Sequence, residues 1–334
     1  MPTPKKLPSG NWRCLVYIGK DKNGKNKYKS VTAESRKACI TKAALITDKP
    51  KKEQKITVRE AVEQNILIRK DVLSPATVRG YYKILRCNLT PIADIPVSEL
   101  TAEDMQQLVN SMVRSLSVKT IQNALGLLRP SLKGFVSSDI FDITLPQKKP
   151  TDIQIPSRET AAKLEQAISG LEIELPVLLA MQCGLRMSEV LGIKKSDADF
   201  VNRTLTVRRA IVVNEVGIAV EKAPKSYCGN RTIPMPGKVA ELLEKADENG
   251  YAVKLTAISI SKRLDTVMKK AGIPHIRFHD LRHYYASVCL LLNMPERYAM
   301  EFMGHSTPGM LKKYQHIMDD EKKRLGDQLS NYFN

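Results

Sequence analysis

The sequence has no apolar run long enough to cross a membrane. Its longest uncharged stretch, Tyr284–Pro295, has 12 residues, whereas a membrane-spanning helix needs about 20. No apolar segment follows Lys5 and Lys6 near the start, so we expect no signal peptide. These absences predict a cytoplasmic protein with no membrane partner.

Cysteine is scarce, and its spacing argues against the common cysteine-based sites. The six cysteines, at positions 14, 39, 87, 183, 228 and 289, lie far apart and form no Cys-x-x-Cys pair. This pattern fits neither a zinc site nor a disulfide framework. We expect reduced, buried thiols. A glycine-rich P-loop for nucleotide phosphates is also absent from the sequence.

Positive charge, by contrast, is abundant. The 334 residues include 53 lysines and arginines against 35 aspartates and glutamates, a net charge of +18. Residues 1–55 alone hold 15 of the basic residues and 4 of the acidic ones. Such a surface attracts nucleic-acid phosphates, which predicts a DNA-contacting module in this segment. The alternative is a solvated basic tail.

The start of the chain has the pattern of a β-hairpin. Apolar side chains alternate with other residues along the first stretch, at Trp12, Cys14, Val16 and Ile18. Turn residues then lead to a second extended stretch at residues 27–31, and a helix is expected over residues 34–46. Residues 1–50 are therefore predicted to form a small domain of a β-sheet and a helix. On that sheet we interpret Trp12 and Tyr17 as packing residues, with DNA contact as the alternative.

Residues 56–148 have helical patterning. Capping residues stand before each of four expected helices, at Thr57, Ser74, Thr101 and Ser117. Apolar residues at helical spacing supply inward faces, and Pro130 should kink or end the fourth helix. A four-helix domain is predicted, with linkers at residues 49–53 and 145–156.

Residues 153–334 are predicted to form a mixed, mostly helical domain. Helical patterns are interrupted by strand-like segments at residues 204–213, 218–221 and 231–235. The expected fold class of the whole chain is mainly α with small β-sheets (α+β), divided into several domains.

All five histidines fall near the end, at positions 275, 279, 283, 305 and 316. In the pattern His279-Asp-Leu-Arg282-His283, a helix that begins near His279 would place His279 and Arg282 on one face. The free N–H groups of that helix end favour an anion, which predicts a phosphate site. A metal site is the alternative, because His279 and His283 are four residues apart. A zinc protease helix, however, has Glu where this chain has Asp280.

Two further patterns flank this one. Cys183-Gly-Leu-Arg186-Met-Ser-Glu189 puts an arginine at a glycine-assisted turn before a short helix. Taken alone, Arg186 would most often be a surface residue paired with Glu189. Downstream, Met303-Gly-His305-Ser precedes Tyr314, which alone would usually be a packing residue.

In this order, the series around Arg186, His279-x-x-Arg282, Gly-His305-Ser and Tyr314 resembles the tyrosine recombinase or phage integrase family. The resemblance covers essentially the whole chain. It implies that Tyr314 is the nucleophile that attacks a DNA phosphodiester. Arg186 and Arg282 would then clamp the phosphate oxygens as their negative charge grows. His279 would accept the proton of Tyr314, and His305 would donate a hydrogen bond to the phosphate.

The family also has a catalytic lysine on a β-hairpin between its first arginine and its His-x-x-Arg element. In this chain Lys225 matches that position best, and Lys222 is the alternative. The resemblance implies that Lys225 donates a proton to the departing 5′ oxygen of DNA. Glu189 would orient Arg186 or the local backbone and take no part in the chemistry.

The resemblance implies a site-specific recombinase that integrates or excises a mobile element or prophage through a 3′-phosphotyrosine intermediate. That intermediate retains a reactive phosphoester, so neither a metal nor another cofactor is expected. The implied partners are double-stranded DNA at core and arm attachment sites and three further copies in a synaptic homotetramer. An excisionase and a host DNA-bending protein are further candidate partners.

By the same resemblance, residues 1–50 correspond to the arm-binding domain of integrases from phages and conjugative transposons. Residues 56–148 correspond to the core-binding domain, and residues 153–334 to the catalytic domain. Two alternatives stay open. A non-catalytic DNA-binding regulator would not need the full set of site residues, and a type IB topoisomerase would not need an arm-like module.

Overall fold

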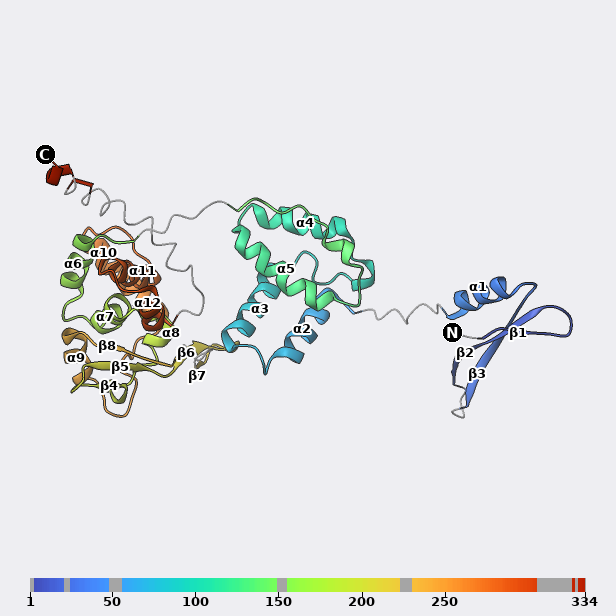
Figure 1. Ribbon diagram of the computed structural model, residues 1–334, viewed down its shortest axis with the longest axis horizontal. Coiled ribbons are helices and arrows are strands. Elements are labelled where there is room, and N and C mark those ends of the chain that lie inside the picture. Colours follow the sequence, from blue (N-terminus) through green and yellow to red (C-terminus); the bar gives the residue numbers. More distant parts are fainter. Residues whose placement is uncertain are drawn as a thin grey trace. The chain divides into compact units, whose positions relative to one another are not determined.

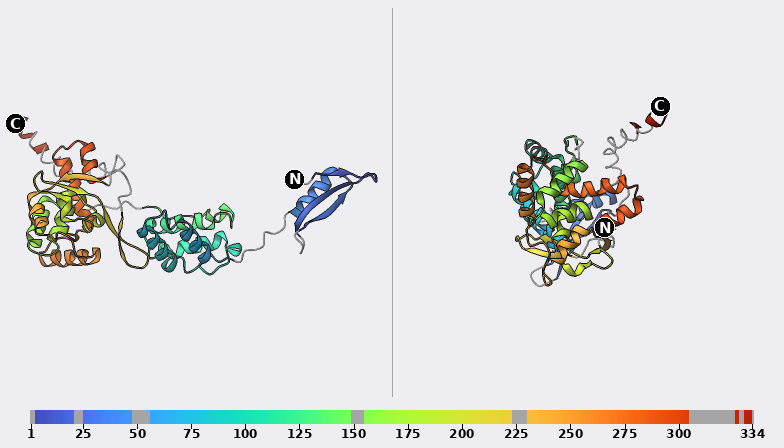
Figure 2. Two further views of the ribbon diagram at one scale, coloured as in Figure 1. Left: turned by 90° about the horizontal axis from the view of Figure 1, so that it is seen from below. Right: turned by 90° about the vertical axis from the view of Figure 1, so that its left-hand side faces the viewer.

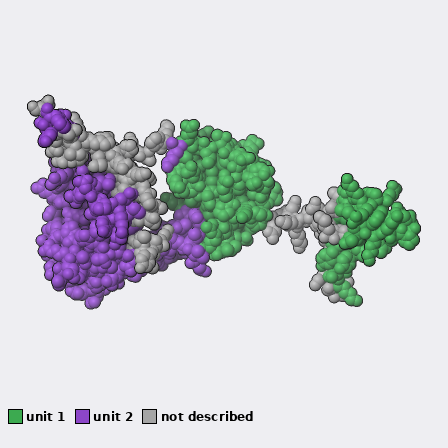
Figure 3. Space-filling view, in the orientation of Figure 1, with its two compact units in different colours: residues 1–69, 83–147 green, residues 70–82, 148–334 purple. Residues whose placement is uncertain are grey.

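The computed structural model describes residues 3–20, 25–47, 56–148, 155–222, 230–304, 326–327 and 330–333. Contacts within the chain define two compact units, residues 1–69 with 83–147 and residues 70–82 with 148–334 (Figure 3). Helices predominate and the sheets are small and antiparallel, which confirms the predicted fold class. Across the described ranges, no helix has both the length and the apolar character needed to cross a bilayer.

The first part of the chain is a sheet with one helix. Its elements are β1 (Lys5–Lys6), β2 (Trp12–Lys20), β3 (Asn26–Ala33) and α1 (Arg36–Thr47). The strands pair antiparallel in the order β1-β2-β3, and α1 packs against β2 and β3 (Figures 1 and 2). The predicted hairpin and helix are confirmed. The edge strand β1 was not expected, because two lysines carry no strand pattern.

Alternation along β2 gives the two faces of this sheet different characters. Cys14 and Val16 are buried with residues of β3 and α1, and Trp12 packs against this cluster. Tyr17 is 50% exposed, and its ring meets the edge of the Tyr28 ring with centroids 5.7 Å apart. The packing interpretation therefore holds for Trp12 and is wrong for Tyr17, which is out of phase with the buried positions.

Four helices follow where the capping residues predict them. They are α2 (Val58–Arg69), α3 (Pro75–Cys87), α4 (Ala102–Val113) and α5 (Val118–Leu132), with short 3-10 turns η1 (Val97–Glu99) and η2 (Ser138–Phe141). At the start of α2 the Thr57 backbone N–H donates to Glu60 Oε2 at 2.8 Å. Pro130 lies in the last turn of α5, which ends two residues later. Local capping thus sets these helix starts.

The remaining part is mixed. Its helical elements are α6 (Arg158–Ile168), α7 (Glu174–Cys183), α8 (Met187–Val190), η3 (Lys195–Asp197), α9 (Gly237–Glu244), α10 (Ala257–Lys270), α11 (Phe278–Leu291) and α12 (Glu296–Met303). Its strands are β4 (Ala198–Asp199), β5 (Thr204–Val207), β6 (Ala210–Val213), β7 (Ala219–Lys222) and β8 (Arg231–Pro234). One sheet has the order β4-β5-β8, and β6 pairs with β7 alone (Figure 1).

The single strand predicted over residues 204–213 is wrong. The structure divides it into β5, which pairs with β8, and β6, which pairs with β7. The break falls at Arg208 and Arg209, and the Arg209 side chain donates from Nη1 to the buried Asp197 Oδ2 at 2.7 Å. An alternating sequence pattern does not reveal this long-range pairing.

Helix α7 lies at the centre of the mixed part. Its residues are buried on all sides, including Pro176, Val177, Leu178, Leu179, Ala180 and Met181. Helix α11 packs along it, and both contribute to the same core. The close packing of these two helices therefore fixes the positions of their ends.

The cysteine prediction holds in part. Cys14, Cys39, Cys183 and Cys289 are buried thiols, whereas the thiol of Cys87 is exposed in the last turn of α3. Cys228 lies outside the described residues. Burial raises the pKa of the Cys183 thiol to about 12, so this group stays protonated at neutral pH.

Candidate active site

A glycine turn joins α7 to α8. Helix α7 ends at Cys183 and is capped by Gly184, whose left-handed φ of 66° suits glycine. A Cβ on Gly184 would lie 2.5 Å from Cδ1 of the Tyr285 ring on α11. Space and backbone conformation both require glycine here. The turn places Arg186 immediately before α8.

Glu189 on α8 is a buried carboxylate that binds several guanidinium groups. It accepts hydrogen bonds from Arg186, from the backbone N–H at 3.0 Å and from Nη1 at 2.7 Å. Arg231 Nη2 donates to it at 2.9 Å and Arg231 Nη1 at 3.3 Å. Arg282 Nη1 lies 4.0 Å from Glu189 Oε2. One carboxylate is therefore shared by three guanidiniums, which we call the Glu189 cluster: Arg186, Glu189, Arg231 and Arg282.

The charge of Glu189 is held by its neighbours. Burial by itself would raise the pKa of this carboxyl. The hydrogen bonds and positive charge of Arg231, followed by the charge of Arg186, outweigh burial and lower the pKa from 4.5 to about 2. Glu189 is therefore ionised at neutral pH.

Backbone carbonyls complete the cluster. Arg186 Nη2 donates to the Gly304 carbonyl at 2.9 Å, and Arg231 Nε donates to the Phe302 carbonyl at 2.7 Å. Arg282 donates to the carbonyls of Gly184 and Met303. These carbonyls lie at the ends of α7 and α12, where the helix dipole is negative and stabilises a cation. These hydrogen bonds connect the end of α12, which precedes His305 in the sequence, to the three arginines.

The helix that carries the His-x-x-Arg pattern begins at Phe278, which confirms the expected helix start near His279. Its N-terminus is fixed by Asp280, which accepts from the Arg277 backbone at 3.1 Å and from Arg277 Nε at 2.8 Å. His279 is exposed, whereas the Arg282 side chain is only 2% exposed. The two residues share a helix but differ in their access to solvent.

Both histidines on α11 favour the neutral form. Although His279 is exposed overall, desolvation of its ring, followed by the charge of Arg282, lowers its pKa below the ordinary 6.5. Burial and the neighbouring His279 lower the pKa of His283 to about 4. The two rings meet edge to face, with centroids 4.7 Å apart and planes at 82°. Neutral imidazoles can accept a proton.

The structure brings together only part of the predicted site. Arg186 and Arg282 meet at Glu189, and His279 lies one turn before Arg282 on α11. Lys225, His305 and Tyr314 fall outside the described residues. Lys222, the alternative lysine, is the last residue of β7.

Sequence reasoning missed Arg231. The residue is the first of β8, where burial alternates and Arg231 faces inward together with Ile233. The sequence does carry a signal for Arg231, because this arginine is in phase with the buried positions of a short strand. A buried guanidinium needs a partner, which marks such an arginine as a candidate site residue. The partner is Glu189, 42 positions earlier in the chain.

The metal alternative gains no support from the described ranges, where no group of three or more His, Cys, Asp or Glu side chains is arranged to hold an ion.

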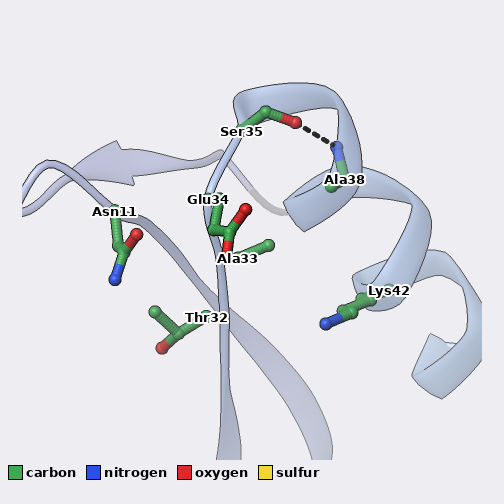
Figure 4. Close-up of a pocket in the computed structure, with 7 residues that line it drawn as sticks. All are labelled: Asn11, Thr32, Ala33, Glu34, Ser35, Ala38 and Lys42. Atoms are coloured by element: carbon green, nitrogen blue, oxygen red, sulfur yellow. Dashed lines mark hydrogen bonds between the residues drawn. The ribbon is translucent and has the colours of Figure 1, made fainter.

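A separate hollow lies beside the start of α1, lined by Asn11, Thr32, Ala33, Glu34, Ser35, Ala38 and Lys42 (Figure 4). There Ser35 Oγ accepts from the Ala38 backbone at 3.2 Å. This contact caps α1, so it belongs to the first part of the chain, the sheet with one helix.

Residues 157–321 match the phage integrase family. This segment contains Arg186, Glu189, Arg231, His279 and Arg282. This segment is a domain of the tyrosine recombinase, or phage integrase, family.

Curated relatives agree with this membership. A tyrosine recombinase XerC-like protein of Caldanaerobacter subterraneus subsp. tengcongensis is 23% identical, over 96% of this chain and 96% of its own. The transposase from transposon Tn916 of Enterococcus faecalis is 27% identical, over 56% of this chain and 53% of its own.

Two solved structures share the fold. The Tn1549 transposon integrase, solved in complex with transposon right end DNA, has a TM-score of 0.67 at 20% identity and covers 81% of this chain and 100% of its own. A lambda integrase dimer bound to a COC′ core site has a TM-score of 0.61 at 16% identity and covers 94% of this chain and 95% of its own. At these identities the likeness concerns the fold alone.

Proposed function

We propose that this chain is a site-specific DNA recombinase, an integrase that cleaves and rejoins DNA through a 3′-phosphotyrosine on Tyr314. The observation that carries the proposal is the Glu189 cluster. There Arg186 and Arg282, far apart in the sequence, meet at one carboxylate beside the end of α12. Among the described residues the cluster has three guanidiniums and one carboxylate, and an anion such as a DNA phosphate would offset its positive charge.

Cleavage in this proposal is an in-line displacement. The Tyr314 oxygen attacks the phosphorus, a phosphorus–tyrosine oxygen bond forms, and the bond to the 5′ oxygen breaks. The proton of Tyr314 passes to His279, whose lowered pKa leaves it neutral and able to accept. Lys225 donates a proton to the departing 5′ oxygen, and His305 donates a hydrogen bond to the phosphate.

Arg186 and Arg282 stabilise the charge that develops on the non-bridging oxygens. The Arg186 side chain is 37% exposed and is oriented by Glu189, so it is suited to direct hydrogen bonds with the phosphate. Arg282 is 2% exposed and is held by carbonyls, so it acts mainly through its charge.

Another tyrosine near the cluster is a poor nucleophile. Tyr285 on α11 packs over Gly184, and burial raises the pKa of its phenol. A phenol held in its protonated form attacks phosphorus slowly. Tyr285 is therefore not the nucleophile in this proposal.

Rejoining reverses these steps. The free 5′ hydroxyl of a second DNA strand attacks the phosphotyrosine, and Tyr314 leaves as its protonated form is restored. The phosphoester link keeps the energy of the broken bond, so this route needs no nucleotide hydrolysis and no metal.

The other two parts contribute DNA binding in this proposal. Residues 1–50 bind arm sites through the exposed face of the small sheet, which bears Arg13, Leu15, Tyr17, Tyr28, Ser30 and Thr32. Residues 56–148 bind the core site, and residues 153–334 carry the chemistry. Four copies assemble on two DNA sites, with an excisionase and a DNA-bending protein as accessory partners. A dimer and a tetramer of the related lambda integrase have been seen on DNA.

The test is covalent trapping on nicked DNA. Duplexes that carry the ends of the DNA element encoding this chain, with a nick near the cleavage point, should accumulate a protein–DNA adduct in EDTA. Tyr314→Phe should lose the adduct and keep DNA affinity. Binding without any adduct would indicate the regulator, and relaxation of supercoils lacking these sites would indicate the topoisomerase. Cleavage that requires a metal and leaves no adduct would falsify the proposal.

A further inference from the structure

Arg231 is a buried cation that the catalytic roles above do not use. Its side chain is 3% exposed, and it donates through three nitrogens. Nη2 and Nη1 reach the two oxygens of Glu189 at 2.9 and 3.3 Å, and Nε reaches the Phe302 carbonyl at 2.7 Å. A planar guanidinium can hold such a three-point arrangement, which the ammonium of lysine cannot reproduce.

These contacts close a ring that contains Arg186. Glu189 accepts hydrogen bonds from Arg231 and from Arg186. Arg186 also donates a hydrogen bond to the Gly304 carbonyl at 2.9 Å. Gly304 is two residues beyond Phe302, which accepts from Arg231. The ring therefore joins α8 and β8 to the end of α12.

The ring also includes the ends of two elements that are next to predicted catalytic residues in the sequence. Arg231 begins β8, and β8 follows the segment that contains Lys225. Phe302 lies in the last turn of α12, Gly304 caps this helix, and His305 comes next in the sequence. The Arg231 side chain thus connects the start of β8 and the end of α12 to α8, whose Glu189 orients Arg186.

We propose that Arg231 is a positioning residue, whose three-point contact fixes Arg186 through Glu189 and fixes the end of α12 from which His305 and Tyr314 follow. This inference rests on the proposed recombinase function. A misplacement of about 1 Å in a catalytic arrangement can cost about 100-fold in rate. Loss of Arg231 should therefore slow the chemistry and leave DNA binding nearly intact.

Arg209 provides a matched control. It is also an arginine on a buried carboxylate, with Nη1 and Nη2 at 2.7 and 3.1 Å from the two oxygens of Asp197. Arg209 Nη1 also donates to a backbone carbonyl, that of Gly192, at 3.1 Å. These contacts involve none of the predicted catalytic residues, so the two arginines differ mainly in what they position.

The experiment compares Arg231→Met, Arg231→Lys, Arg209→Met and Arg209→Lys in the full chain. The measurements are the single-turnover rate of adduct formation on nicked element-end DNA at saturating protein, the Kd for the same DNA, and the melting temperature. We expect Arg231→Met to lose about 100-fold in rate with a Kd within about threefold. Arg209→Met should melt lower as well but keep the rate within about threefold.

Arg231→Lys decides the matter if Arg231→Met does not fold. It keeps the charge but lacks the planar fork, so the rate should fall about tenfold at unchanged Kd, and Arg209→Lys should stay near the wild-type rate. A wild-type rate in Arg231→Lys, or equal losses at both arginines, overturns the inference. If the wild-type chain forms no adduct, or Tyr314→Phe keeps one, the proposed function itself fails.

Discussion

Two buried carboxylates in the same part of the chain begin from one local motif and end in different environments. Glu189 accepts from the backbone N–H of Arg186 at 3.0 Å, and Asp197 accepts from the backbone N–H of Lys194 at 2.9 Å. Both are therefore caps of short helical turns, three residues after the donor.

The two carboxylates differ in the side chains that the tertiary structure brings to them. Asp197 binds Arg209 through both oxygens, and Arg208 lies 3.8 Å away. Arg209 has a second carboxylate, Glu221, at 3.7 Å. We call these four residues the Asp197 cluster. It contains two guanidiniums and two carboxylates and is balanced in charge.

The Glu189 cluster is not balanced. Even without Arg282, two guanidiniums share one carboxylate there, and helix-end carbonyls supply the remaining acceptors. A balanced cluster holds structure together, whereas a positive one can also receive an anion. Under the proposed function, the cap at Asp197 supports the architecture, whereas the cap at Glu189 also orients Arg186 for the chemistry.

The largest effect should come from neutralising each carboxylate in turn. Glu189→Gln leaves several guanidiniums without their shared anion and should cost about 3–5 kcal/mol in the free energy of unfolding. Asp197→Asn leaves Arg209 near Glu221 and should cost less, about 2 kcal/mol. Urea denaturation followed by circular dichroism measures both, and adduct formation should fall only in Glu189→Gln. Equal costs with equal activity would remove the distinction between the clusters.

Acid should weaken the protein through Glu189. The folded-state pKa of about 2 lies below the ordinary 4.5, so ionised Glu189 contributes stability above pH 4.5 that is lost as the pH falls toward 2. Linkage makes this contribution about 3 kcal/mol. Unfolding free energies measured between pH 6 and pH 2.5 should fall more steeply for the wild-type chain than for Glu189→Gln. Parallel curves would contradict the assigned charge state.

The smallest effect is expected at the edge of the Asp197 cluster. The Tyr251 hydroxyl donates to Glu221 Oε2 at 2.8 Å, and Tyr251→Phe removes this one hydrogen bond. The cost should be about 0.5–1 kcal/mol, with adduct formation unchanged. Thermal melting and the trapping assay test this together. A loss of activity here would show that the Asp197 cluster also serves the chemistry.

The sequence predicted the features that depend on local interactions. Helix starts at Thr57 and Thr101 follow from caps that bond within one turn, and both stand where expected. The order of the four motifs from Arg186 to Tyr314 indicated the family. The structure brings two residues of these motifs, Arg186 and Arg282, to one carboxylate. The domain boundaries and the catalytic roles of all the site residues, from Arg186 to Tyr314, stay predictions.

The features that the sequence alone left undecided depend on distant partners. The exposure of Tyr17, the division of residues 204–213 into two strands and the burial of Arg231 follow from which face or strand each residue meets after folding. A cap needs only neighbours along the chain, so sequence determines it. The charge balance around Glu189 needs β8 and the end of α12 to arrive at α8, and only the packed tertiary structure brings them there.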